Sequence, residues 1–255
     1  MKRRPTPAVA GLALVAGLAF VGGCASTRVV EPTQINGAVT ADSERQLVMT
    51  YTGGDCDVST RAEAVENGPA ITVRVFVTTR NGVCDAVGYI RTVVAQLSAP
   101  WGNRAVVDST GATVPVLDGA LLLRPSWLPD GYQGGTLTAG PSDDGTAEAL
   151  QEWTPPDTTE IPSPGVIECR PTAAGVALAQ GYGIVPAYSL LPGSQALVDG
   201  TQVTVDRDDW GDLGLYWTPP GHPSGWTVSL QSEQECSGFA PLSLDTLLRI
   251  ANGLH

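Results

Sequence analysis

The sequence contains few of the residues on which proton-transfer and amine chemistry depend. Lys2 is the only lysine among the 255 residues, and the two histidines are His222 and the terminal His255. These counts exclude a lysine nucleophile from the body of the chain and leave one internal histidine as a candidate base. Neither histidine is near a cysteine in sequence and there is no CxxC motif, so we expect no metal and no cofactor.

Positive charge is scarce as well. The formal net charge is −12, and removal of residues 1–23 would take away Lys2, Arg3 and Arg4 but no acid, which lowers the charge to −15. A chain this acidic repels nucleic acid and anionic lipid head groups, so nucleic-acid binding is not expected and attachment to a membrane would be covalent. Because 42% of the residues are hydrophobic and 16% are charged, the composition predicts folded domains.

The first two dozen residues have the order of an export signal. A basic start precedes an apolar run from Ala8 to Phe20, which is shorter than the roughly 20 residues that span a bilayer as a helix. The run leads to Val21-Gly22-Gly23-Cys24, which resembles the lipobox of bacterial lipoproteins. The resemblance implies a lipid on the sulfur of Cys24 and a mature chain held on the extracytoplasmic side of the cell membrane. An ordinary secretory signal with an incidental cysteine is the alternative.

Four further cysteines predict disulfides. They are Cys56, Cys84, Cys169 and Cys236. An even number in an exported chain indicates two bridges, although four cysteines allow three pairings. We favour Cys56 with Cys84 and Cys169 with Cys236, because each pair then lies within one strand-rich block that can fold alone.

Composition and periodicity divide the chain into segments. After the signal peptide of residues 1–23, residues 24–44 are small and polar, which predicts a flexible tether that holds the folded part off the membrane. Residues 45–118 contain several short strand patterns with turns between them, which predicts a β-sandwich. In Ile71–Arg80, alternate residues from Ile71 to Val77 are apolar, and Asn81-Gly82 predicts a hairpin to a strand at Tyr89–Leu97.

Residues 119–255 form the second predicted domain. Its expected strands are Ala149–Trp153, Gly175–Gln180, Thr201–Asp206, Leu213–Trp217 and Gly225–Gln231, and the stretch from Ala139 to Pro164 is otherwise expected to be an exposed loop. A C-terminal helix follows Ser243 as its N-cap, with an apolar stripe that should cover a sheet. The fold class is therefore α+β, mainly β: an antiparallel β-sandwich-like domain and an antiparallel sheet domain with a packed C-terminal helix.

Two resemblances cover most of the mature chain. The stretch from Gln46 to about Val116, with TYTGGDC, ITVRVFVTT and QLSAPWGNRAVVD, is similar to a module of actinobacterial lipoproteins. The stretch from about Leu121 to Leu254, with WLPDGY, DGTQVTV, LGLYWTPPG, WTVSL and PLSLDTLLRIANGL, resembles a sheet-plus-helix domain of unknown function found in extracytoplasmic parts of membrane and anti-sigma-factor proteins. That group is related in shape to lipoprotein carriers. These motifs report a fold and no chemistry.

Three arrangements could carry chemistry, and each has a simpler interpretation. His222 lies in a Pro- and Gly-rich turn whose order is not GxSxG, so we interpret it as an exposed turn histidine rather than a base. Asp206, Asp208, Asp209 and Asp212 crowd one loop, whereas glycosidase carboxylates face each other across roughly 5 to 9.5 Å. Calcium could use Asp206 and Asp208, but Trp210 stands at the next ligand position. A solvated acidic loop is favoured.

The six tryptophans offer a last hypothesis. They could stack on cell-wall sugars or fill a β-rich core. We expect Trp217 and Trp226, which lie in strand patterns, to be buried, and Trp101 and Trp210, which lie in loops, to be exposed.

The sequence thus favours a membrane-anchored extracytoplasmic lipoprotein that is not an enzyme. Its expected role is a binding or scaffolding module at the cell envelope, with an envelope protein as partner. Carriage of a lipid or other apolar ligand is the alternative, and a carboxylate-based cell-wall hydrolase ranks below both. A cavity of about 300 Å³ or more under the terminal helix would favour carriage.

Overall fold

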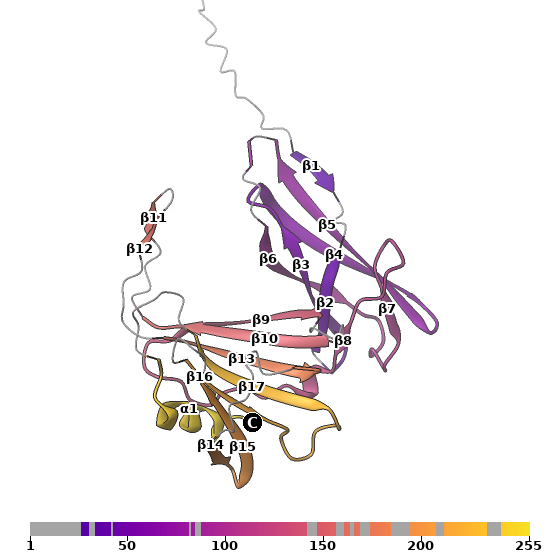
Figure 1. Cartoon of the computed structure of the whole chain (residues 1–255). Helices are drawn as coiled ribbons and strands as arrows, with labels where there is room; N and C mark the ends of the chain where they lie inside the picture. The colour runs from indigo at the N-terminus through magenta and orange to yellow at the C-terminus, as the bar shows by residue number, and fades with distance from the viewer. Residues whose placement is uncertain are drawn as a thin grey trace, which may run out of the picture.

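The structure is a computed structural model. It describes residues 27–30, 34–41, 43–81, 83–84, 88–141, 147–156, 161–163, 166–168, 174–184, 194–207, 212–233 and 241–255. Antiparallel strands predominate, and the one α-helix among these residues is C-terminal (Figure 1). The predicted class, α+β and mainly β, is confirmed.

The N-terminal part is a sandwich of two sheets. The first has the order β1 (Thr27–Val30), β5 (Ala70–Arg80), β4 (Asp57–Asn67), with β7 (Ala105–Val107) also paired to β5. The second has the order β6 (Tyr89–Gln96), β3 (Gln46–Gly53), β2 (Ile35–Ala41), β8 (Val116–Leu117). All pairs are antiparallel except β5 with β7 and β2 with β8.

The core of this sandwich follows the alternation of β5. Ile71, Val73, Val75 and Val77 are at most 3% exposed, as their spacing predicts. They belong to one buried cluster with Leu47, Met49 and Tyr51 of β3, so the inner faces of both sheets meet there. Burial of alternate residues is the ordinary consequence of the two-residue period of a strand.

The predicted hairpin at Asn81-Gly82 is wrong. β5 and β6 lie in different sheets, and β6 pairs with β3. The hairpin partner of β5 is instead the preceding strand, β4, which was not predicted from the sequence. The two strands are joined at Gly68-Pro69, between the paired residues Asn67 and Ala70, and Gly68 has the positive φ of 60° that such a tight turn requires.

The predicted tether is wrong where the structure describes it. β1 and β2 both fall within residues 24–44, and most of β2 is buried in the sheet between β3 and β8. Its small residues are needed for close packing, because a Cβ at Gly37 would lie 2.9 Å from the backbone nitrogen of Gly140. Residues 24–26, 31–33 and 42 of the predicted tether lie outside the described residues.

The second part is a seven-stranded antiparallel sheet. Its order is β14 (Ser194–Val198), β15 (Thr201–Arg207), β16 (Leu213–Trp217), β17 (Trp226–Glu233), β13 (Gly175–Tyr182), β10 (Ala147–Thr154), β9 (Gln133–Pro141). A short separate ladder joins β11 (Ile161–Ser163) to β12 (Val166–Glu168). The strand predicted at Ala149–Trp153 lies within β10, but the exposed loop expected around it is wrong where β9 ends and β10 begins, because Ala139 and Ala147 are buried.

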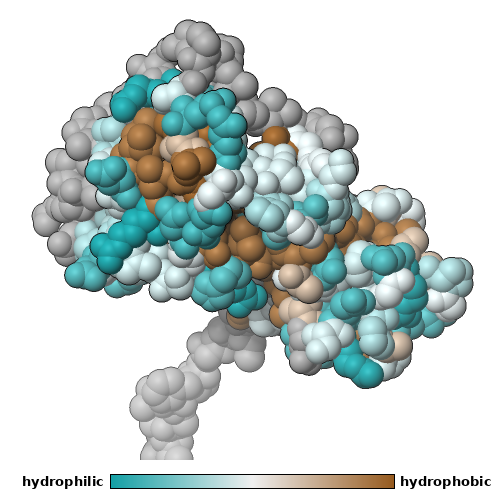
Figure 2. Space-filling view, turned by 90° about the horizontal axis from the view of Figure 1, so that it is seen from below, coloured by the Kyte–Doolittle hydropathy of each residue, from teal (hydrophilic) through white to brown (hydrophobic). Residues whose placement is uncertain are grey.

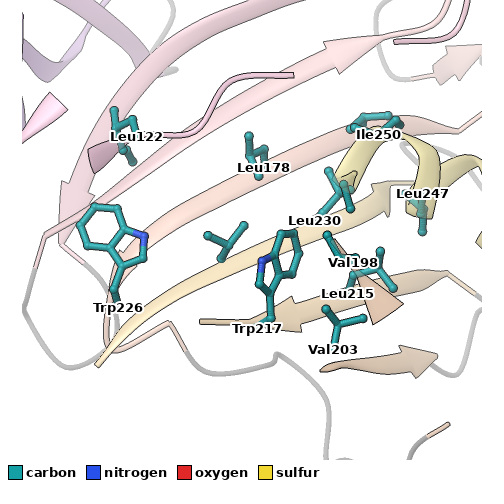
Figure 3. Close-up of a cluster of buried hydrophobic side chains, with 14 of the residues drawn as sticks. Leu122, Leu178, Val198, Val203, Leu215, Trp217, Trp226, Leu230, Leu247 and Ile250 are labelled. Carbon is teal, nitrogen blue, oxygen red and sulfur yellow. The ribbon is translucent and has the colours of Figure 1, made fainter. Parts of the chain in front are cut away.

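Helix α1 (Leu244–Ala251) covers one face of this sheet. Leu247 and Ile250 are fully buried and, as Figure 3 shows, lie beside Leu230 of β17 and near Val198 of β14. Ser243 is the N-cap, as predicted, and its hydroxyl accepts a hydrogen bond from the backbone N–H of Thr246 at 3.2 Å. The predicted packing of the terminal helix on a sheet is confirmed.

The two parts share strands. Val39 of β2 and Leu117 of β8 belong to the core of the seven-stranded sheet, whereas Ala38 belongs to the core of the sandwich. The hydroxyl of Thr50 on β3 accepts a hydrogen bond of 2.8 Å from the backbone of Ala139 on β9. The predicted domain boundary between residues 118 and 119 therefore does not separate the two cores, because β2 and β8 of the sandwich contribute residues to the core of the seven-stranded sheet.

Candidate functional site

The first disulfide is where the sequence predicted it. Cys56 and Cys84 are bonded, with their Cα atoms 5.6 Å apart. Cys24, Cys169 and Cys236 lie outside the described residues, so the lipidation site and the second bridge stay predictions. Asp55 lies next to the Cys56–Cys84 pair, but sulfurs held in a disulfide are not thiolate ligands, and this group is a poor candidate for a metal site.

The acidic loop is only partly described. Asp206 is 6% exposed, and its Oδ1 accepts a hydrogen bond from the backbone N–H of Arg207. Its Oδ2 is buried without a hydrogen-bond partner among the described residues. Asp208, Asp209 and Trp210 lie outside those residues, so the calcium and paired-carboxylate hypotheses are not tested. Asp206 itself belongs to strand β15 and is buried, which corrects the expectation that this residue is solvated.

Two of the tryptophan predictions are confirmed. Trp217 and Trp226 are 7% and 0% exposed, and Trp226 packs edge-on against Tyr182 with 5.4 Å between ring centroids. Trp101, predicted to be exposed, is partly buried against the sandwich core, and its Nε1 donates to the carbonyl of Arg104 at 2.7 Å. A partly buried ring whose N–H is already hydrogen-bonded offers a smaller surface for stacking on a sugar than a fully exposed ring would.

His222 is in a turn, as predicted, but it is half-buried and has a structural contact. Its Nε2 lies 2.8 Å from the carbonyl oxygen of Leu121, and because a carbonyl can only accept, Nε2 must carry the proton. The ring lies 5.6 Å from that of Trp226. Its Nδ1 is buried and has no hydrogen-bond partner among the described residues. His222 therefore ties the β16–β17 loop to the segment around Leu121 and activates no described nucleophile.

A pocket opens where this loop meets the end of α1. Its volume is about 260 Å³, and it is lined by residues from four separated stretches of the chain. The lining residues are Leu123, Val198, Asp199, Thr201, Trp217, Pro219, Pro220, His222, Ala251 and Leu254. Most of the lining is apolar, and Asp199, Thr201 and His222 supply the polar groups. Apolar walls with a few polar groups are typical of binding sites.

The tight turn between β14 and β15 forms one side of the pocket. Val198 pairs with Thr201, and the two residues between them, Asp199 and Gly200, have φ angles of 47° and 79°. Positive φ at both positions defines a hairpin turn for which Asp-Gly is a preferred sequence, so this signal was available in the sequence and was missed. The side chain of Asn252, at the end of α1, accepts a hydrogen bond of 2.8 Å from the backbone of Asp199. The turn is thereby held to the helix.

Leu123, another lining residue of the pocket, is held by a buried amide. Gln180 of β13 is 0% exposed, and its side chain makes two 2.8 Å hydrogen bonds, one to the N–H and one to the carbonyl of Leu123. The C-terminal residues pair with the adjacent segment, since Arg124 and His255 exchange two backbone hydrogen bonds. Leu123 and Leu254 are thus fixed before any ligand enters.

The pocket lies at the end of the molecule far from β1. Figure 1 places β14, β15 and α1 at one end and β1 at the other. Figure 2 views the molecule from the end that carries β14, β15 and α1. Hydrophobic residues gather there in two areas, one of them ringed by hydrophilic residues. The position means that a ligand could enter without contact with the first sheet of the sandwich.

Two carboxylates with lowered pKa values are structural. Burial acts to raise the pKa of Asp108, but hydrogen bonds from Thr110, Ala112 and Gly111 outweigh it and hold the pKa below its usual value. Hydrogen bonds from the hydroxyl and backbone of Ser98, and then from Arg104, lower the pKa of Glu66 to about 2. Neither residue lines the pocket. The hydrogen bonds that lower these two pKa values stabilise a turn and a loop of the sandwich.

Comparison with known proteins adds no assignment. No protein-family model, curated protein or solved structure matches this chain. Among the described residues, no helix is both long and apolar enough to cross a membrane. Function must therefore be inferred from the sequence pattern and the pocket.

Proposed function

We propose that the protein is an extracytoplasmic lipoprotein, anchored by a lipid on Cys24, that acts as a non-enzymatic binding module at the cell envelope. The lipobox-like residues Val21-Gly22-Gly23-Cys24 and the acidic, lysine-poor composition support the anchor. The resemblance to lipoprotein modules stays a prediction, because no comparison matched. The pocket supports the binding role.

The size of the pocket indicates what it binds. Its volume of about 260 Å³ is just below the roughly 300 to 1,000 Å³ of small-molecule sites, and it is partly open to solvent. An open pocket of this size with proline and tryptophan walls suits one large apolar side chain presented by another protein, in the manner of an anchor residue at an interface. We therefore place an apolar anchor of an envelope protein in contact with Trp217 and Pro220.

Carriage of an apolar ligand is the second candidate. The pocket lies beside the terminal helix, where a carrier would hold its ligand, and this position favours the idea. The volume does not reach the 300 Å³ that we set for carriage, so this candidate ranks below protein binding. A paired-carboxylate hydrolase has less support at the pocket, because Asp199 is the only carboxylate among the described lining residues.

A photo-crosslinking experiment tests the binding role. A photoreactive phenylalanine analogue replaces Pro220, which lines the pocket and is exposed, and the full chain is irradiated in intact cells. We expect a discrete protein adduct that disappears when Thr201→Trp fills the pocket. The matched control carries the analogue at Ser109, an exposed turn residue of the sandwich. A lipid adduct at position 220 would support the carrier, and equal labelling with and without Thr201→Trp would refute a role for the pocket.

A further inference from the structure

The lipid attachment site lies very close in sequence to the first strand. β1 begins at Thr27, three residues after Cys24. Each extended residue spans at most about 3.6 Å, so the backbone of Cys24 lies within roughly 11 Å of Thr27. Because Thr27 pairs with Arg80 at the end of β5, a lipid on Cys24 must lie near this end of the sandwich.

Several connections of the sandwich meet at the same end. The backbone N–H of Arg80 donates to the carbonyl of Cys56 at 3.0 Å, and Cys56 is bonded to Cys84. Tyr89, the first residue of β6, pairs with Gly53, the last residue of β3. Register and disulfide therefore bring the starts of β1, β4 and β6 together, and Figure 1 shows β1 at the end of the molecule away from α1.

Exposed apolar side chains concentrate at this end. Eight large hydrophobic residues are exposed among those that the structure describes, and five of them lie here. We name these five residues the anchor end: Val29 (60% exposed), Val58 (60%), Val83 (100%), Tyr89 (45%) and Ile90 (58%). Each is one of the paired or bonded residues above or lies within two positions of one in sequence: Val29 follows Thr27 by two residues, Val58 follows Cys56 by two, and Val83 precedes Cys84. Scattered exposed apolar residues are ordinary, but a cluster marks a contact surface.

We propose that the anchor end lies in the interfacial region of the membrane that holds the lipid, so that the sandwich stands on the bilayer and the pocket faces away from it. This inference rests on the proposed lipidation of Cys24. A bilayer is the occupant because the short connection brings its surface to this end, where apolar side chains leave water and Tyr89 takes the interfacial position that tyrosine favours. The disulfide and the hydrogen bond from Arg91 to the carbonyl of Gly54, 2.9 Å long, hold the surface in shape.

Quenching by brominated lipids tests the orientation. The full chain is expressed with its signal, the mature lipidated protein is purified, and it is placed in vesicles of phosphatidylethanolamine and phosphatidylglycerol with brominated acyl chains. Tyr89→Trp adds a fluorophore at the anchor end, and Leu197→Trp adds one at a site that is 64% exposed on β14, next to the pocket. Both variants keep the same six native tryptophans, so the emission that each adds to the wild-type spectrum can be compared directly.

We expect the emission added by Tyr89→Trp to lose most of its intensity in brominated vesicles, and that added by Leu197→Trp to be unchanged. Ile90→Trp provides a second reporter at the anchor end if the first variant does not fold. Equal quenching at positions 89 and 197 of a lipidated protein would overturn the orientation and leave the anchor intact. A purified mass that lacks the lipid would instead overturn the proposed anchor, and the orientation with it.

Discussion

The buried amide of Gln180 should hold the wall of the pocket, and its replacement by methionine measures how strongly. Methionine has nearly the same length but cannot form the two 2.8 Å hydrogen bonds to Leu123. The substitution therefore removes the polar contacts and leaves little cavity.

The expected cost follows from the groups that lose their partners. Leu123 keeps an N–H and a carbonyl that no longer have a hydrogen-bond partner, and each such buried group costs about 1 to 3 kcal/mol. Leu123 is only half-buried, so water can replace part of the loss. We expect Gln180→Met to lower the free energy of unfolding by about 2 to 4 kcal/mol.

Urea unfolding at neutral pH, followed by tryptophan fluorescence, gives this free energy if the transition is two-state. The matched control is Gln133→Met on the exposed edge strand β9, where the side chain makes no described hydrogen bond and the change should stay within about 0.5 kcal/mol. If Gln180→Met costs no more than Gln133→Met, the two hydrogen bonds do not hold Leu123 and the reasoning about the pocket wall is wrong.

Two further predictions concern stability. Glu66 has a pKa of about 2 in the folded protein against an ordinary 4.5, so its contribution is complete above about pH 4.5 and is lost as the pH falls to about 2. Its side chain is 16% exposed and partly screened, so Glu66→Gln should cost about 1 to 2 kcal/mol at pH 7 and progressively less as the pH falls through about 2. A pH-independent difference in unfolding experiments would contradict this. Leu247→Ala should cost about 2 to 5 kcal/mol, because this side chain of α1 is fully buried against the sheet. The substitution should cost more than Leu244→Ala, because Leu244 is half-buried on the first turn of α1; equal melting temperatures of the two variants would show that α1 does not pack as described.

The parts of the fold that the sequence predicted correctly are those with a strong local pattern. β5 is a run of β-branched residues at every second position, and Ser243 is a cap followed by a short apolar stripe, so both can be recognised without their partners. β4 was missed because its inward residues, Ala62 and Ala64, are small and alternate with charged residues. Alanine has little preference for strands, and only pairing with β5 makes the segment one.

Turn signals show the same limit. Asn81-Gly82 and Asp199-Gly200 are both typical hairpin sequences, yet only the second joins two paired strands. The strands on either side of Asn81 pair elsewhere: β5 pairs with β4 along most of its length, and β6 pairs with β3 along its whole length. A local preference for a turn is worth less than the burial gained by pairing with a distant strand.

The sequence by itself determined which reactive groups the protein has: little lysine and histidine, many acidic residues and the cysteines available for disulfides. The lipobox-like residues before Ala25 also predict its compartment. Tertiary structure alone decided that Cys56 bonds to Cys84 among its possible partners, that four separated stretches line one pocket, and that this pocket lies far from β1. The physical reason is that strand order and register are set by competition for burial over the whole chain. Residues as distant in sequence as Leu123 and Leu254 therefore become neighbours only when the complete sheet has formed.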